Sequence, residues 1–297
     1  MIECINLEKN YGKNKALNNI NFKMPVGSTL GVIGQNGAGK TTLFKIILRL
    51  IEADKGKVVW KKGIDVQNQV GYLPEERGLN IKRTIEDQIR FLAKLKAMPI
   101  HKIDQQIDYW LEKFEVQVNR KDKIESLSKG NKQKIQIICS IIHRPKLLIL
   151  DEPYSGLDPV NAKILSDGIA ELSQEGTTII FSSHNMTNIE NVCENIIMLK
   201  AGEVVLNGSI NEIQEIYGDN IVYIDNSPVI KQKIHQIKLI ESIEEQKNNI
   251  LKITLKDSKI GKEIFDIVCS QGYVKLFKQT SPTLDEIFRQ KVSEHVE

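Results

Sequence analysis

The chain has 297 residues, a length that exceeds one typical small domain and favours two domains. Hydrophobic residues make up 41% and charged residues 27% of the sequence, a balance typical of globular proteins that excludes a disordered or fibrous chain. The 41 basic and 38 acidic residues leave a net charge of +3, too small an excess to indicate a nucleic-acid-binding protein.

The cysteines and the apolar runs restrict where the chain works. Cys4, Cys139, Cys193 and Cys269 lie far apart and form no zinc or redox spacing, so we expect no disulfide framework. The first residues are acidic and polar where a secretory signal would be apolar. No apolar run reaches the roughly 18 residues that cross a bilayer. We therefore expect a cytoplasmic chain that reaches a membrane only through a partner.

Strands and helices are predicted to mix along the N-terminal two thirds of the chain. Alternating or short apolar runs predict strands, and apolar residues three or four positions apart predict helices. Strands are expected at 2–7, 17–24, 28–33, 70–73, 147–150, 177–181, 196–199 and 204–206. Helices are expected at 41–50 and 160–172, and a helical subdomain at about 84–142. We interpret two apolar stripes in this subdomain as core faces: Ile85, Ile89, Leu92, Leu95, and Ile107, Trp110, Leu111, Phe114.

The pattern changes near residue 217, where turn-forming residues gather. Beyond that point it predicts strand, helix, two strands, helix, strand and a final helix from Pro282. This βαββαβ order is typical of a small α+β ferredoxin-like domain. We therefore predict one domain at 1–217 and an accessory domain at 218–297. The accessory elements are expected at 221–224, 229–236, 239–244, 250–255, 260–271 and 274–277.

Residues 34–41 read GQNGAGKT and match the phosphate-binding pattern GxxxxGK[ST]. Glycines let backbone N–H groups turn toward phosphate oxygens, and the helix that follows points its positive end at the same anion. Lys40 would reach the β- and γ-phosphates, and the Thr41 hydroxyl would hold Mg²⁺. An ordinary glycine turn is the alternative, but the motif follows an apolar strand and opens a helix, which favours phosphate binding.

The run Leu147–Leu150 predicts a buried strand that carries Asp151 and Glu152 at its end. Asp151 would hold the metal, and Glu152 would polarise an attacking water. A buried strand that ends in an acidic turn is common, so this motif gains its meaning from the phosphate loop upstream.

Taken together and in order, these motifs resemble the ATP-binding cassette family, the motor subunits of ABC transporters, from about residue 2 to residue 215. Residues 34–42 are similar to the Walker A loop and Asp151–Glu152 to Walker B with its catalytic glutamate. The segment 127–131, LSKGN, resembles the signature LSGGQ, and residues 155–158 resemble the D-loop. Glu75 stands at the Q-loop position, His184 at that of the switch histidine, and Tyr11 at that of the aromatic that stacks on adenine.

The resemblance implies a P-loop NTPase fold, with a RecA-like core and antiparallel β and helical subdomains, that uses ATP and Mg²⁺. It implies catalytic roles for Glu152 and His184, and metal contacts for Thr41, Glu75 and Asp151. The expected ATP-binding residues are Tyr11, Gly34, Gln35, Asn36, Gly37, Ala38, Gly39, Lys40, Thr41 and Thr42. The residues expected to contact ATP on a partner subunit are Ser128, Lys129, Gly130, Asn131 and Asp158.

Two features depart from the family pattern. Glu75 replaces the usual Gln, and Lys129 and Asn131 replace Gly and Gln of the signature. These variants, with the strings LPEERGLN and PTLDEIF, look most like bacterial export-type cassettes, including sodium-extrusion and antibiotic-resistance subunits. Glu75 would place an added negative charge near the Mg²⁺.

The expected function is ATP binding and hydrolysis that powers a membrane exporter through ATP-sandwich dimerisation. The expected partners are a second ATPase subunit, identical or different, and an integral-membrane permease that docks near residues 75–79; nucleic acid is not expected. The expected location is the inner face of the cell membrane. Alternatives are a soluble cassette ATPase that acts on ribosomes or DNA, and a regulatory module without turnover. Tyr11 and His184 each have a purely structural alternative. For Tyr11 it is a partly buried strand residue, and for His184 it is a hydrogen-bonded histidine without a catalytic role.

Overall fold

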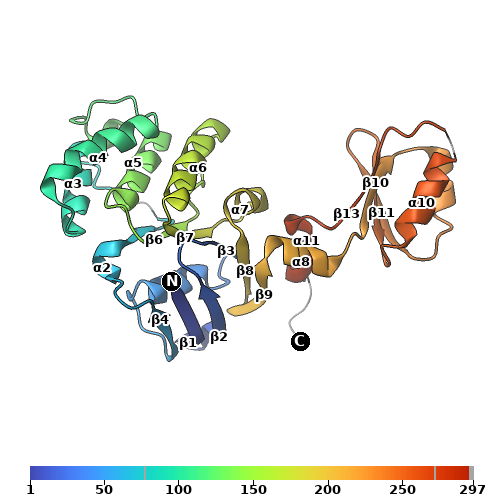
Figure 1. The fold of residues 1–297 in the computed structure, drawn as a ribbon, viewed down its shortest axis with the longest axis horizontal. Coiled ribbons are helices and arrows are strands. Elements are labelled where there is room, and N and C mark those ends of the chain that lie inside the picture. Colours follow the sequence, from blue (N-terminus) through green and yellow to red (C-terminus); the bar gives the residue numbers. More distant parts are fainter. Residues whose placement is uncertain (77, 271, 294–297) are drawn as a thin grey trace. The chain divides into compact units, whose positions relative to one another are not determined.

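The computed structural model describes residues 1–76, 78–270 and 272–293, and divides into two compact units, Met1–Gly208 and Ser209–Glu297 (Figure 1). The sequence analysis placed the boundary after Tyr217. The difference is helix α8 (Ile210–Tyr217), which the structure groups with the second unit. The helix begins where strand β9 ends, because Ser209 and Glu212 form a reciprocal capping box there.

A six-stranded sheet forms the centre of the first unit, in the order β5-β6-β7-β3-β8-β9. Its strands are β3 (Thr29–Ile33), β5 (Val70–Leu73), β6 (Leu147–Asp151), β7 (Thr178–Ser182), β8 (Asn195–Lys200) and β9 (Glu203–Ser209). The pairs from β5 to β8 are parallel. Every residue of β3, β6 and β7 is buried, as expected for parallel strands with both faces covered.

A second, three-stranded antiparallel sheet has the order β2-β1-β4. Its strands are β1 (Ile2–Tyr11), β2 (Asn14–Met24) and β4 (Lys55–Trp60). One hydrophobic core, with Leu7, Phe44 and Ile180 fully buried, joins this sheet to the large sheet and to helix α1 (Lys40–Ile47). The fold class expected from the sequence, a P-loop core with an antiparallel β subdomain, is confirmed.

The helical subdomain consists of α3 (Ile85–Leu95), α4 (Ile100–Lys113) and α5 (Lys129–Ile141), which contact one another pairwise. A 3₁₀ turn, η1 (Ile124–Ser126), precedes α5. The stripe on α4 is a core face as predicted, with Trp110 fully buried. The prediction for α3 was wrong at its end: Ile85 and Ile89 are buried, but Leu95 is 61% exposed because the last turn of α3 leaves the subdomain core.

Four further helices complete the first unit and lead into the second. They are α2 (Val66–Gln69), α6 (Pro159–Gln174), α7 (Met186–Val192) and α8. Asn185 starts α7 by accepting a hydrogen bond from the Thr187 amide at 3.0 Å. In the described residues, no helix is long and apolar enough to cross a bilayer.

The second unit has a four-stranded antiparallel sheet in the order β11-β12-β10-β13. Its elements are β10 (Ile221–Asp225), α9 (Pro228–Ile234), β11 (Ile240–Gln246), β12 (Ile250–Leu255), α10 (Ile260–Cys269), β13 (Phe277–Thr280) and α11 (Leu284–Ser293). The βαββαβ connection with this strand order is the predicted ferredoxin-like arrangement. Strand β13 begins three residues later than expected, since Phe277 is the residue that pairs with Ile224.

Candidate nucleotide site

The phosphate-loop residues Gly34 to Gly39 connect the end of β3 to the start of α1. Gly34 and Gly39 adopt positive φ angles of 157° and 107°. A Cβ atom would lie 2.5 Å from the Leu199 carbonyl oxygen at Gly34 and 2.5 Å from the Ala16 carbonyl oxygen at Gly39. Only glycine at these two positions therefore allows the loop to pack this closely against the backbone of Leu199 and Ala16.

Lys40 is folded into this loop and is 8% exposed. Its ammonium group donates to the carbonyl oxygens of Gly34 at 2.7 Å and Gln35 at 3.3 Å. Gln35, Asn36 and Gly37 are exposed at the tip, and Thr41 and Thr42 follow in the first turn of α1. The loop thus presents backbone N–H groups and a cation at one helix end, the arrangement that binds phosphate.

Thr41 and Asp151 meet although 110 residues separate them in the sequence. The Thr41 hydroxyl donates to Asp151 Oδ2 at 3.1 Å. The other carboxylate oxygen accepts from the Ser182 hydroxyl at 2.6 Å, and Asp151 is 1% exposed. Asp151 and Ser182 are paired at the ends of β6 and β7, so the parallel register brings the carboxylate to the phosphate loop.

Glu152 leaves the strand in a left-handed conformation with φ at 50°. Its backbone N–H donates to the Ser182 hydroxyl at 3.0 Å, and its Oε2 lies 2.8 Å from Nδ1 of His184. Burial raises the pKa of Glu152, and the charge and hydrogen bond of His184 oppose that rise. His184 itself is 73% exposed, so the pair has its carboxylate inside and its imidazole toward solvent.

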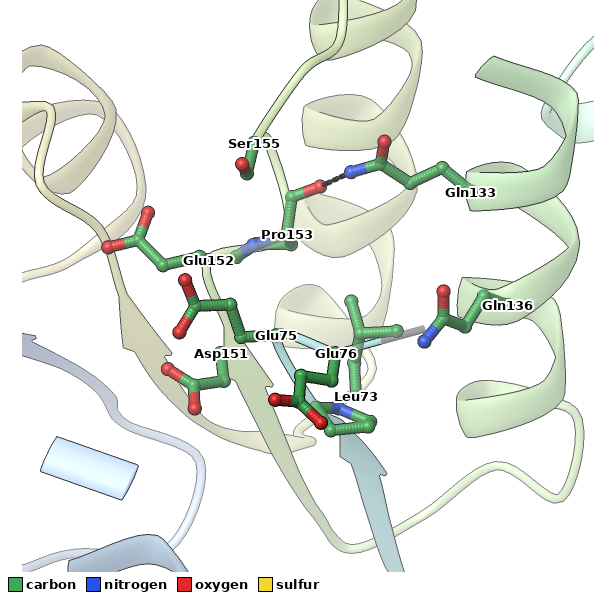
Figure 2. Close-up of a pocket in the computed structure, with 10 residues that line it drawn as sticks. Leu73, Glu75, Glu76, Gln133, Gln136, Asp151, Glu152, Pro153 and Ser155 are labelled. Atoms are coloured by element: carbon green, nitrogen blue, oxygen red, sulfur yellow. Dashed lines mark hydrogen bonds between the residues drawn. The ribbon is translucent and has the colours of Figure 1, made fainter. Parts of the chain in front are cut away.

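A cavity of about 380 Å³ lies beside these residues (Figure 2). Four carboxylates line it: Glu75, Glu76, Asp151 and Glu152. The structure therefore brings Glu75, at the Q-loop position, next to Asp151 at the end of β6 and to Glu152, which follows it. Gln133 of α5 lines the same cavity and donates from Nε2 to the Pro153 carbonyl oxygen, as Figure 2 shows. We refer to this space as the carboxylate cavity.

The donor set around Thr41 fits a hard divalent cation. Such cations take carboxylate, hydroxyl, water and phosphate oxygens. Thr41 and Asp151 are already within hydrogen-bond distance of each other, and Glu75 lines the adjoining cavity. Within the described residues, no three His, Cys, Asp or Glu side chains form a metal site by themselves. A cation here would therefore depend on oxygens from water or nucleotide as well as from the protein.

The signature segment begins helix α5. The Ser128 side chain caps this helix by accepting from the Asn131 amide at 3.2 Å, and both Ser128 and Lys129 are exposed. Asp158 likewise caps α6, accepting from the Asn161 amide at 2.9 Å. A Cβ at Gly130 would lie 3.4 Å from the side-chain nitrogen Nδ2 of Asn161, so the two helix starts are neighbours. The signature residues are not among those that line the carboxylate cavity.

Tyr11 lies at the end of β1 and is 51% exposed. The Lys9 ammonium is 5.9 Å from the ring centroid and forms an ion pair with Asp54 at 2.8 Å. The ring is thus available at the surface rather than buried in the core.

Three functional candidates were missed from the sequence: Ser182, Glu76 and Gln136. Ser182, in the string FSSHN, is the last residue of the buried strand β7, as Asp151 is of β6, and a polar residue at the end of a buried strand is the signal that could have found it. Glu76 and Gln136 line the carboxylate cavity from elements that only the fold brings together. Arg77, part of the LPEERGLN string, lies outside the described residues.

The fold and the site together define a P-loop ATPase of the cassette type. The profile of the family described as "ABC transporter" matches residues 17–155, and that of the "ATP-binding protein DrrA1-3-like, C-terminal domain" matches residues 208–292. The chain belongs to the ATP-binding subunits of ABC transporters, and the resemblance seen in its motifs is confirmed.

Individual relatives support this assignment. The chain is 37% identical to the uncharacterized ABC transporter ATP-binding protein YhaQ of Bacillus subtilis over 98% of each chain. It is 30% identical to the linearmycin resistance ATP-binding protein LnrL of the same species, over 77% of this chain and 76% of LnrL. A solved dimeric structure of the ATP-binding cassette MJ0796 with ADP and Pi shares the fold, with a TM-score of 0.63 and 22% identity over 71% of this chain and 99% of that one.

Proposed function

We propose that this chain is the motor of a bacterial exporter, which closes with a second cassette around ATP and Mg²⁺ and drives a membrane permease. One observation carries the proposal: a continuous hydrogen-bonded series runs from Thr41 through Asp151 and Ser182 to Glu152 and His184. It joins a phosphate-binding loop to a buried carboxylate and to an acid–imidazole pair, the parts that nucleotide hydrolysis needs.

Lys40 and the loop would hold the phosphates. The Lys40 ammonium now bonds to the carbonyl oxygens of Gly34 and Gln35, and it would turn to the β- and γ-phosphate oxygens when ATP enters. The Thr41 hydroxyl and the Asp151 carboxylate would hold Mg²⁺, with Glu75 as a further oxygen donor from the carboxylate cavity. Bound Mg²⁺ would supply charge neutralisation of the phosphates. The exposed Tyr11 ring would stack on adenine.

Glu152 would act as the general base. Burial raises its pKa, which makes the ionised carboxylate a better proton acceptor for an attacking water. His184 holds the carboxylate through Nδ1 and, from its exposed position, would orient the water and the γ-phosphate.

Two cassettes would complete each site. Ser128, Lys129, Gly130 and Asn131 stand at the start of α5, where the N-terminal end of the helix dipole favours an anion from another subunit. Asp158 caps the neighbouring helix and would contact the same interface. The dimeric MJ0796 structure supports a pair of this kind, identical or not.

The permease partner would dock near residues 75–79, beside the carboxylate cavity, and hold the chain at the inner face of the membrane. Two names support this proposal. YhaQ is named as an ATP-binding protein of an ABC transporter, which supports a role in transport. LnrL is named as a linearmycin resistance ATP-binding protein, which supports export in particular.

Glu152→Gln tests the mechanism and the dimer together. The variant keeps the reach of the side chain but loses the basic carboxylate and a negative charge near the nucleotide. We expect it to bind ATP, to lose turnover, and to accumulate as a dimer in light scattering with ATP and Mg²⁺. Adding Ser128→Arg should abolish that dimer and leave ATP binding by the monomer intact. A Glu152→Gln protein saturated with ATP that remains monomeric at high concentration would contradict a self-sufficient homodimer.

A further inference from the structure

Two Asn-Gly pairs occur in the chain, Asn36–Gly37 in the phosphate loop and Asn207–Gly208 in strand β9. In such a pair the backbone nitrogen of the glycine can attack Cγ of the asparagine side chain and close a five-membered ring. Glycine favours this attack because it has no side chain to hinder the approach. Whether the ring forms in a folded protein depends on how the backbone of the pair is held.

The phosphate loop leaves the first pair open to this attack. Asn36 and Gly37 are both exposed and lie in the turn that the Ala38 amide closes by donating to the Gln35 carbonyl oxygen at 3.1 Å. Within the described residues, neither the Gly37 amide nor the Asn36 side chain makes a hydrogen bond. Gly37 has a φ angle of 82°, and no atom outside the adjacent residues would lie within 4 Å of a Cβ there. The attacking nitrogen and the carboxamide therefore have room to approach each other.

The second pair supplies a comparison within the same molecule. Asn207 is exposed like Asn36, so exposure does not distinguish the two pairs. Asn207 and Gly208 lie in strand β9, which is hydrogen-bonded to β8 at the edge of the six-stranded sheet. Ring closure requires a rotation about the asparagine ψ angle that the extended backbone of a paired strand does not allow. The backbone conformation therefore selects Asn36.

We propose that Asn36 is a site of spontaneous deamidation that bound nucleotide suppresses. The Gly37 nitrogen loses its proton and bonds to Asn36 Cγ, the Cγ–Nδ2 bond breaks, and ammonia leaves. Water then opens the cyclic imide at either carbonyl and yields aspartate or isoaspartate, with no oxidation or reduction. Both products carry one more negative charge, and isoaspartate also adds one atom to the backbone of the loop.

The protection by nucleotide rests on the proposed function. In the proposed complex the loop amides, that of Gly37 among them, donate to phosphate oxygens. An amide held in this way can neither lose its proton nor turn toward Asn36. Nucleotide should therefore slow the reaction at this residue.

The modified loop would bind nucleotide less well. The new carboxylate follows directly on Gln35, whose carbonyl oxygen accepts from Lys40 Nζ at 3.3 Å. It would repel the phosphates and compete with them for the Lys40 ammonium group. Deamidation thus marks chains that have spent long periods without nucleotide and lowers their affinity for ATP.

Peptide mass spectrometry with detection of isoaspartate tests the proposal on the full chain. The protein is incubated in mildly alkaline buffer with and without Mg²⁺ and a non-hydrolysable ATP analogue. We expect Asn36 to react without the analogue, as it does in a free peptide of residues 33–41, and Asn207 to remain unmodified. With the analogue at about ten times its Kd, the unbound fraction and hence the rate at Asn36 should fall about tenfold.

Asn36→Asp reproduces the charge of the aspartate product. We expect this variant to bind ATP about tenfold more weakly, the effect of one like charge near the phosphates. Asn207→Asp makes the same exchange on β9 and is the matched control, with unchanged affinity. Wild-type affinity in Asn36→Asp would overturn the inferred effect on binding.

The remaining outcomes are distinct. An unmodified Asn36 in nucleotide-free protein, under conditions in which the free peptide reacts, would overturn the inference. Equal reaction with and without the analogue at a saturated site would overturn the protection, and equal reaction at Asn207 would overturn the selection by backbone conformation. A chain that binds no ATP would refute the proposed function, and the nucleotide-free incubation alone would then decide whether Asn36 deamidates.

Discussion

The Ser182 hydroxyl donates to Asp151 Oδ1 at 2.6 Å and at the same time accepts the Glu152 backbone N–H at 3.0 Å. One side chain on β7 thus fixes both acidic residues at the end of β6. Since the two strands are parallel neighbours, the contact depends on their register rather than on any local motif. Ser182 would orient the Asp151 carboxylate, which we propose as a metal ligand, and the start of the strained turn at Glu152.

Ser182→Ala should therefore reduce turnover while the nucleotide remains bound. We expect ATP hydrolysis to fall by about 10- to 100-fold, as is typical when a residue that orients a metal ligand is lost. The buried Asp151 oxygen would lose its donor, which should lower the free energy of unfolding by about 1–3 kcal/mol. Steady-state ATPase assays and denaturant titrations check both. Ser28→Ala, which removes a bond to the Pro25 carbonyl away from the site, is the control.

Lys40→Ala should remove a charge-assisted phosphate contact. The expected loss is about 2–4 kcal/mol of nucleotide affinity or transition-state stabilisation. Titration with a fluorescent ATP analogue and turnover assays measure it. Lys45→Ala, an exposed lysine on the same helix, should leave both unchanged. Wild-type turnover in Lys40→Ala would refute the assignment of the phosphate site.

Glu75→Gln should shift the Mg²⁺ dependence of hydrolysis toward higher Mg²⁺ and leave ATP binding intact. A carboxylate in the carboxylate cavity adds an anionic oxygen that a hard cation favours over an amide oxygen. The measurement is a Mg²⁺ titration of the ATPase rate at saturating ATP. Glu52→Gln, at an exposed position, is the matched control. Superimposable titrations for wild type and Glu75→Gln would mean that Glu75 does not contact the metal.

His184→Ala should move the acid limb of the pH–rate profile to higher pH. Glu152 must be ionised to accept a proton, so activity falls as pH drops through its pKa. Burial raises this pKa and the charge and hydrogen bond of His184 lower it. Removing the imidazole leaves only the charge of Lys40 to oppose the effect of burial, and the pKa of Glu152 rises further. Measurements of kcat against pH at saturating ATP test this. A limb that stays in place or moves to lower pH would show that His184 does not act on Glu152.

A chain that ends at Ser209 should fold and bind ATP with unchanged affinity. It keeps every strand of the six-stranded sheet and every candidate nucleotide residue from Tyr11 to His184. We propose that the second unit tunes dimerisation or coupling to the partner rather than binding nucleotide. Circular dichroism and ATP titration check the truncated chain. A truncated chain that folds but fails to bind ATP would show that nucleotide binding requires the second unit.

Much of the fold could be predicted because the deciding signals are local. The apolar runs of β5 and β6 ended within one residue of the prediction, and the glycine loop identified its own strand–loop–helix setting. Features set by distant pairing could not be predicted in this way. The start of β13 depends on Phe277 meeting Ile224, and the role of Ser182 depends on the strand beside it. Helix α7 is short and polar, so no apolar period marked it.

The apolar period of α3 misled the prediction for a physical reason. Ile85 and Leu95 belong to one stripe in the sequence, yet one is buried and the other is 61% exposed. The hydrophobicity of a residue alone does not determine whether its side chain is buried in the core or exposed at the surface. The exposed fraction of each side chain distinguishes them, and it is known only when the fold has placed every neighbour.

The left-handed backbone at Glu152 carries a further consequence for evolution and engineering. A non-glycine residue at φ 50° costs free energy that glycine would not, so the chain would be more stable with glycine there. That exchange would delete the carboxylate which we propose to activate water. Selection for thermal stability alone would therefore act against catalysis at this position, and a screen that enriches stable variants must also demand turnover if it is to keep Glu152.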